Sequence, residues 1–106
     1  MKSPIIILLT LLSLLVASSG CVEKSSDTKS SAIQKCIELC KNYNYEYLDK
    51  SPCLSNEIEP DWVCDVAHSP RQAIDNLPEN QCEAWRNKTA KHFVELDTNC
   101  NLIKAF

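Results

Sequence analysis

The sequence predicts a small α+β domain, in which one long N-terminal helix packs on a short antiparallel sheet of about three strands and disulfides stabilise the fold. Three observations predict this class. The chain has 106 residues, enough for one domain. Six cysteines are spread over residues 36–100. An apolar stripe with helical spacing precedes segments rich in strand-forming residues.

The first 20 residues are typical of a signal peptide for export. Lys2 provides a positive charge, residues 5–17 form an almost continuous apolar run, and small residues follow at positions 18–20. This run is shorter than the roughly 20 residues that a membrane-spanning helix needs, which favours a cleaved signal over a permanent anchor. Gly20 is the only glycine of the chain, so residues 21–106 contain no glycine-rich phosphate loop.

Cys21 is the expected site of lipid attachment. Ser19-Gly20-Cys21 matches the last three positions of a lipobox, although Ser18 replaces the usual leucine. Residues 21–31 are expected to form this cysteine and a polar tether, because they are rich in serine and lack apolar periodicity. A lipid here would anchor the domain to the outer face of the cell membrane. Cleavage at the small residues 17–19 would instead give a secreted protein.

The remaining six cysteines predict three disulfides in a domain at residues 32–106. Cys36 and Cys40 are four residues apart on the predicted helix, so a bond between them would strain it. We expect Cys40 to bond to Cys53 and Cys36 to bond to the later half of the chain. A zinc or redox site at Cys36 and Cys40 has less support because the chain has no C-x2-C pair, and no cofactor is indicated. The six cysteines are Cys36, Cys40, Cys53, Cys64, Cys82 and Cys100.

The long helix is predicted over residues 32–48. Ser31 followed by Gln34 is a capping-box pattern, and Pro52 cannot continue a helix. One face carries apolar residues at helical spacing and is expected to pack inward. This face consists of Ile33, Cys36, Ile37, Cys40 and Tyr47.

The rest of the domain is predicted to alternate strands with short helices. Residues 54–61 are expected to be an irregular connection. Ser69-Pro70 resembles an N-cap followed by proline at the first helical position, which predicts a short helix through about Asn76. Another helical turn is expected within residues 78–87. Strands are expected at residues 62–67, 92–97 and 100–106, with Asn99 at a left-handed turn position between the last two.

Several motifs resemble a family of short cysteine-rich exported proteins or lipoproteins from archaeal genomes. The similarity covers most of residues 36–106, but residues 49–51 read Asp-Lys-Ser where the family often has Asn-Gly. The family has no assigned activity, so the resemblance implies an exported protein of archaeal origin and no reaction. The motifs are PCLS at 52–55, DWVCDVAHSPRQ at 61–72, ENQC at 79–82 and HFVELDTNC at 92–100.

A second candidate for a polar or metal site combines two histidines with two carboxylates. If the strands that carry them pair, His68 and His92 could bind a metal ion with Asp65 or Glu95, or one could act as a general base. Two histidines without H-E-x-x-H spacing are a weak signal. Alternation along residues 92–97 also places His92 and Glu95 on opposite faces of their strand.

A structural role for the same residues is favoured. In that interpretation His68 ends a strand by bonding to Ser69 or to a backbone carbonyl, and Arg71 pairs with Asp75. Enzymatic activity has little support, because Cys64 belongs to the even set of cysteines and the chain has no G-x-S-x-G motif.

Charge and composition restrict the expected partners. The net charge is −3 without a basic block, which argues against nucleic-acid binding. Tyr43, Tyr45 and Tyr47 form an aromatic-polar patch suited to a protein or a cell-envelope ligand. Asn87 begins a glycosylation sequon, which predicts an exposed loop in an exported protein.

These patterns predict a lipid-anchored or secreted extracytoplasmic module with a binding or structural role at the cell envelope. The alternative is a small extracytoplasmic metal-binding protein or enzyme that uses His68 and His92.

Overall fold

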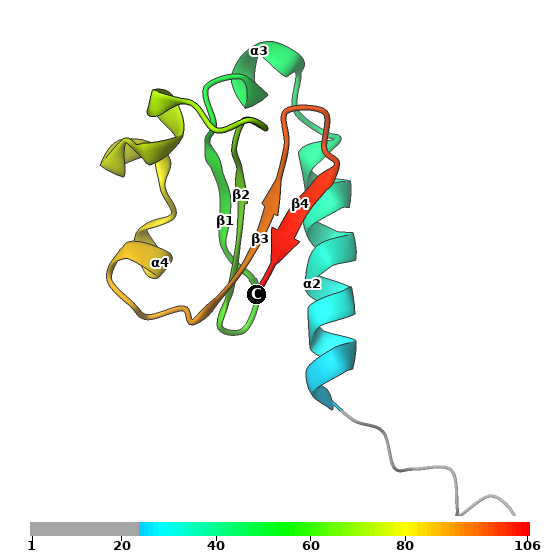
Figure 1. Cartoon of the computed structure of the whole chain (residues 1–106). Coiled ribbons are helices and arrows are strands. Elements are labelled where there is room, and N and C mark those ends of the chain that lie inside the picture. Colours follow the sequence, from blue (N-terminus) through cyan, green and yellow to red (C-terminus); the bar gives the residue numbers. More distant parts are fainter. Residues whose placement is uncertain (1–23) are drawn as a thin grey trace, which may run out of the picture.

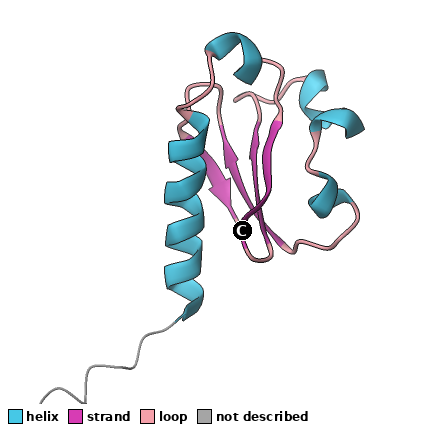
Figure 2. Cartoon of the chain, turned by 180° about the vertical axis from the view of Figure 1, so that it is seen from behind, coloured by secondary structure: helices cyan, strands magenta, loops and turns pink. Residues whose placement is uncertain are grey.

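The computed structural model describes residues 24–106, so the expected signal peptide at residues 1–20 and the expected lipid-attachment site Cys21 lie outside the described part. A four-stranded sheet has helix α2 on one face and short helical turns on the other (Figures 1 and 2). The α+β class is confirmed. The prediction of about three strands is wrong, because the described residues form four.

Helix α2 (Lys24–Cys40) is shorter than predicted at its C-terminal end. The chain turns after Cys40 and forms a separate single-turn helix, α3 (Tyr45–Leu48). Asn44 separates the two, because its side-chain oxygen accepts a hydrogen bond of 2.8 Å from the N–H of Tyr47 and so caps α3.

Two further details of the predicted helix differ from the structure. Ser31 lies inside α2, where its hydroxyl donates to Glu59, and residues 24–31 of the expected tether are helical. Tyr47 is 40% exposed and does not belong to the inward face. The other four residues of that face do contact the core, as predicted; they are Ile33, Cys36, Ile37 and Cys40.

The sheet has the order β1-β2-β3-β4 and is mixed. Its outer pairs are antiparallel, whereas β2 and β3 are parallel, so the prediction of a wholly antiparallel sheet is wrong. Strands β2 and β3 can be parallel because the connection between them, residues 67–91, is long enough to return the chain to the same end of the sheet. The strands are β1 (Cys53–Glu59), β2 (Trp62–Val66), β3 (His92–Leu96) and β4 (Leu102–Ala105).

The connection between β2 and β3 consists of three short helical turns: η3 (Ala73–Asn76), η4 (Pro78–Asn80) and α4 (Glu83–Arg86). The expected turn within residues 78–87 is therefore present. The expected helix start at Ser69-Pro70 is wrong, because residues 69–72 are not helical and the first helical turn, which ends at Asn76 as expected, is capped by Gln72.

The turn between β3 and β4 also differs from the expectation. Cys100, rather than Asn99, has the left-handed conformation, with φ 67°. The Asp97 carboxylate accepts hydrogen bonds from the backbone N–H groups of Asn99 (2.8 Å) and Asn101 (2.9 Å), which holds the turn without a glycine.

The main core lies between α2 and the sheet. Alternate residues of β2 and β3 point toward the helix and are buried, and those between them point to the opposite face. The predicted alternation along β3 is confirmed. The buried strand residues on the helix side are Trp62, Cys64, Val66, Val94 and Leu96.

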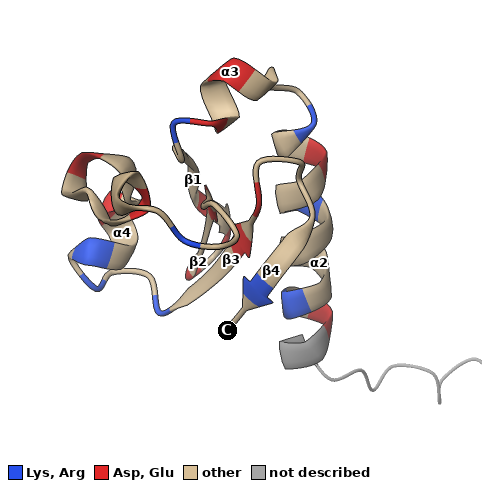
Figure 3. Ribbon diagram, turned by 45° about the horizontal axis from the view of Figure 1, so that its top comes forward, with Lys and Arg blue, Asp and Glu red and all other residues tan. Residues whose placement is uncertain are grey.

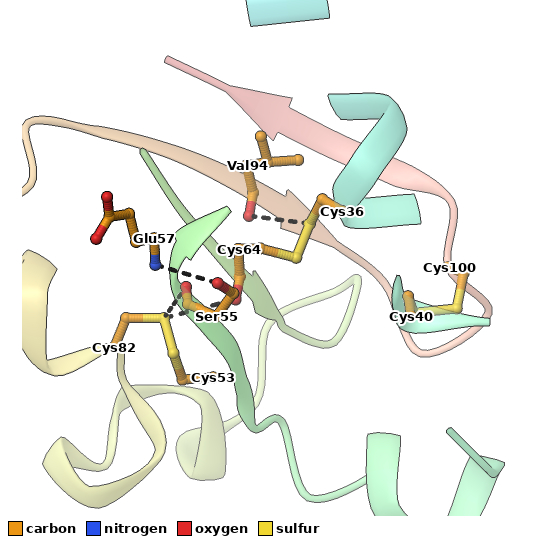
Figure 4. Close-up of a disulfide and its surroundings, with 9 residues drawn as sticks. All are labelled: Cys36, Cys40, Cys53, Ser55, Glu57, Cys64, Cys82, Val94 and Cys100. Carbon is orange, nitrogen blue, oxygen red and sulfur yellow. Dashed lines mark hydrogen bonds between the residues drawn. A yellow bond between two sulfur atoms is a disulfide. The ribbon is translucent and has the colours of Figure 1, made fainter. Parts of the chain in front are cut away.

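Three disulfides connect the elements, and they include all six expected cysteines (Figure 4). The bonds are Cys36–Cys64, Cys40–Cys100 and Cys53–Cys82. As predicted, Cys36 and Cys40 do not bond to each other, and Cys36 bonds to the later half of the chain. The predicted Cys40–Cys53 bond is wrong, because Cys40 meets the β3–β4 turn while Cys53 lies next to α4.

Three disulfides in a domain of this size are typical of an oxidising, extracytoplasmic compartment. None of the helices formed by residues 24–106 is both long and apolar enough to cross a membrane.

Candidate functional site

The structure places His68 and His92 at opposite ends of the sheet. His92 opens β3 and pairs with Trp62 at the start of β2, whereas His68 lies two residues beyond Val66, the last residue of β2. Because the two strands are parallel, the imidazoles do not converge. Within residues 24–106, no group of three or more His, Cys, Asp or Glu side chains is placed to hold a metal ion.

His68 instead lies between two carboxylates. Its Nε2 is 2.9 Å from Oδ1 of Asp49, and its Nδ1 is 2.9 Å from Oδ1 of Asp75. Ser51 donates its hydroxyl to the same oxygen of Asp75, and the N–H of Gln72 donates to Asp75 Oδ2 at 2.7 Å. The expected pairing of His68 with Ser69 or a carbonyl is therefore wrong.

This His68 cluster, formed by Asp49, Ser51, His68 and Asp75, has a structural rather than a nucleophilic geometry. Both imidazole nitrogens face carboxylates, and Oγ of Ser51, although 3.1 Å from His68 Nδ1, donates to Asp75 and is only 2% exposed as a residue. A serine nucleophile would need an exposed hydroxyl and a free imidazole nitrogen. The cluster joins the segment after α3, the end of β2 and η3.

The hydrogen bonds to Asp49 and Asp75 raise the pKa of His68 above its ordinary 6.5. Burial opposes ionisation of Asp75, but hydrogen bonds from Gln72, Ser51 and His68 outweigh it and lower the pKa of Asp75 below 3.8. Both shifts favour an ion pair between imidazolium and carboxylate near neutral pH.

Replacing His68 by glutamine is expected to destabilise the domain more at pH 5.5 than at pH 8.5. The folded state holds the His68 proton more tightly than the unfolded state. The contribution of His68 is therefore complete below pH 6.5 and is lost as the pH rises through the folded pKa. Urea unfolding at both pH values should show a loss of about 1 kcal/mol at the lower pH. An equal loss at both values would contradict the ionised pair.

His92 lies apart from the His68 cluster and packs against Trp62. Its ring stacks on Trp62 with centroids 4.6 Å apart, and its Nε2 is 3.6 Å from Oδ2 of Asp61. Its Nδ1 is 3.3 Å from the carbonyl oxygen of Phe106. The side chain covers one end of the core and faces away from Glu95, as the predicted alternation requires.

The two predicted carboxylates, in contrast, do come together. Asp65 pairs with Glu95 across β2 and β3, and Glu95 pairs with Lys104 across β3 and β4. These three residues form a row on the sheet face that points away from α2. A cavity of about 230 Å³ opens over this row. This Asp65 pocket is lined by Val63, Asp65, Arg71, Gln81, Trp85, Phe93, Glu95 and Lys104.

Asp65 is the unusual group of the pocket. Its Oδ1 is buried and has no hydrogen-bond partner within the described residues. Burial, together with the nearby Glu95 carboxylate, raises the pKa of Asp65 to about 7, while Arg71 acts in the opposite direction. Near neutral pH this carboxyl therefore exists in both protonation states, so it can donate or accept a hydrogen bond.

The other charged groups of the pocket have partners. Nη1 of Arg71 is 3.1 Å from Oε2 of Glu95, so Arg71 does not form the predicted carboxylate pair with Asp75 and touches only its backbone carbonyl, at 3.4 Å. The Lys104 ammonium lies 5.9 Å from the ring centre of Phe93. Among the described residues, Oδ1 of Asp65 is thus the buried side-chain atom of the pocket that another molecule would satisfy.

Trp85 and Phe93 form an aromatic wall of the pocket. Their rings meet edge to face, with centroids 4.9 Å apart, and Trp85 remains 40% exposed. Sequence reasoning did not place Trp85, Gln81 or Lys104 at a site. These three residues come together only through the connection between β2 and β3 and the pairing of β3 with β4. No local sequence motif indicates either feature.

Two surface predictions concern features outside this pocket. Tyr43, Tyr45 and Tyr47 are exposed, and the rings of Tyr43 and Tyr47 stack 4.9 Å apart. That this patch binds a partner stays a prediction. Asn87 is exposed at the end of α4, as expected of a sequon, and its Oδ1 accepts a hydrogen bond of 2.8 Å from the Thr89 hydroxyl. Its glycosylation also stays a prediction.

The fold and the pocket define a small disulfide-stabilised α+β domain with a polar-aromatic cavity on its open sheet face. No known protein family, curated protein or solved structure matches the chain significantly. The resemblance to archaeal exported proteins therefore stays a prediction based on the motifs alone.

Proposed function

We propose that the protein is an extracytoplasmic binding module and that its ligand enters the Asp65 pocket. The observation that carries this proposal is the buried, unpartnered oxygen of Asp65. Burying a carboxyl group without a hydrogen-bond partner destabilises a fold. A polar ligand would supply the missing partner, and a perturbed carboxyl in a cavity is a common mark of a binding site.

We further propose that a lipid on Cys21 holds this module at the outer face of the cell membrane. The lipobox-like residues before Cys21 and the three disulfides of the domain support this location. Secretion without a lipid is the alternative. A shared metal or catalytic centre at His68 and His92 is not proposed, because these residues lie at opposite ends of the sheet.

Intact mass spectrometry of the protein extracted from native membranes tests the location. The expected mass corresponds to a chain that starts at Cys21 and carries a lipid. Alkylation should modify no domain cysteine before reduction and all six afterwards. A mature chain without lipid, or one with free thiols before reduction, would contradict this assignment. The same spectrum reports a glycan on Asn87.

Tryptophan fluorescence tests the binding site. Trp85 is 40% exposed beside the pocket, whereas Trp62 is 6% exposed under α2, so ligand entry should change mainly the Trp85 emission. The full chain in detergent is titrated with neutral monosaccharides, amino acids and monoamines. At least one class should cause a saturable change that Asp65→Ala abolishes.

The matched control is Glu57→Ala, which removes an exposed carboxylate from β1 outside the pocket. This variant should bind like the wild type. The proposal fails if neither these compounds nor any oligosaccharide causes a saturable change, or if Asp65→Ala and Glu57→Ala behave alike.

A further inference from the structure

A second cavity adjoins the Asp65 pocket at Gln81 and Trp85. It has a volume of about 680 Å³, and Gln81 and Trp85 line both cavities. The two therefore form one extended site, in which Trp85 belongs to both cavities. This basic groove is lined by Gln81, Trp85, Arg86, Lys88, Ala90 and Lys91.

The two halves of the extended site differ in charge. The Asp65 pocket contains two carboxylates and two cations. The basic groove contains Arg86, Lys88 and Lys91 and no acidic side chain among the described residues that line it. Within residues 24–106, none of these three cations makes an ion pair. Figure 3 shows blue segments, which mark Lys and Arg, on α4 and in the loop after it. This half of the site is suited to an anion.

The Asp65 pocket is suited to an uncharged polar group. Asp65 and Glu95 offer acceptor oxygens, while Arg71, Lys104 and Gln81 offer donors. A sugar hydroxyl both donates and accepts, so a sugar ring can satisfy such a mixed lining. The exposed face of Trp85 provides a flat apolar surface for the C–H face of a sugar. An acidic peptide fits less well, because its carboxylates would meet Asp65 and Glu95.

We propose that the extended site binds an acidic oligosaccharide, with an uncharged sugar in the Asp65 pocket and a sugar bearing a carboxylate or sulfate in the basic groove. Trp85 contacts the ligand between the two. This inference rests on the proposed binding function and names the ligand class for the same site.

Hyaluronan tetrasaccharide is a suitable probe because it alternates uncharged and acidic sugars. The full chain in detergent is titrated with this probe, with the uncharged N-acetylglucosamine tetramer and with tetraglutamate, and Trp85 emission is followed. The hyaluronan fragment should bind saturably, and each of the other two compounds should bind at least tenfold more weakly. Binding should also weaken as salt is added, because screening reduces the attraction to the groove.

Charge reversal in the groove provides the matched comparison. Lys88→Glu/Lys91→Glu should weaken binding of the hyaluronan fragment at least tenfold. Lys41→Glu/Lys50→Glu makes the same charge change at exposed positions outside both cavities and should leave binding unchanged. The circular dichroism spectra of both variants should match that of the wild type, since every substituted side chain is exposed.

The inference is overturned if the uncharged tetramer or tetraglutamate binds as tightly as the hyaluronan fragment, or if the two double variants behave alike. Failure of every oligosaccharide, combined with Asp65-dependent binding of an amino acid or amine, would overturn only the ligand class. Absence of binding by every compound would overturn the proposed function as well.

Discussion

Replacing Cys40 and Cys100 together by alanine is expected to lower the free energy of unfolding by about 4 kcal/mol. The two residues are 60 positions apart in the chain, and their bond joins the end of α2 to the β3–β4 turn. Without it, the unfolded chain gains the conformational freedom of a long loop, and both cysteine side chains are lost from the core. Urea unfolding followed by circular dichroism measures the change.

The Cys53→Ala/Cys82→Ala variant is the internal comparison. This bond closes a shorter loop, with a separation of 29, so its loss should cost a few tenths of a kcal/mol less on entropic grounds. An unchanged unfolding midpoint in the Cys40/Cys100 variant would show that this bond does not stabilise the native state. Complete unfolding of that variant in buffer would mean that the domain has little stability beyond this bond.

Replacing Asp65 by asparagine is expected to stabilise the domain by about 4 kcal/mol at pH 8. The pKa of Asp65 rises from 3.8 to about 7 on folding, so the folded state binds the proton more tightly than the unfolded state. The stability of the wild type should therefore fall as the pH rises from about 4 to 7 and then level off. Asparagine removes the buried charge while it keeps the shape of the side chain.

The free energies of unfolding of the wild type and of Asp65→Asn should accordingly differ little at pH 4 and most above pH 7. Thermal unfolding over this pH range measures the difference. A difference that does not change with pH would show that Asp65 has an ordinary pKa. A stabilised Asp65→Asn variant that also loses ligand binding would show that the carboxyl is retained for function at a cost to stability.

Local sequence patterns predicted strands β2 and β3. Strand β2 was expected because residues 62–66 are rich in strand formers, and the alternation along β3 placed Val94 and Leu96 toward the helix. Strand β1 was missed, because its residues 53–59 include four polar side chains and lie at the edge of the sheet, where burial leaves a weak pattern. The end of α2 was missed because the cap at Asn44 overrides a continuing apolar spacing.

The candidate site was predicted in part. Asp65 and Glu95 were selected together with His68 and His92, yet only the two carboxylates share a pocket. Parallel pairing of β2 and β3 brings equivalent positions of the two strands side by side and separates a residue at one end from a residue at the other. The direction of β3 relative to β2 depends on the path of the 25 residues that connect the two strands. No local sequence motif indicates this path.

By itself, the sequence determined the composition of the domain: one small α+β unit without glycine, with an even set of six cysteines. These properties depend on counts and on short-range periodicity. Only the tertiary structure decided which cysteines bond, which way β3 runs and which side chains meet over the sheet. Those outcomes depend on contacts between residues far apart in the chain, and the free energy of such contacts is not contained in any local pattern.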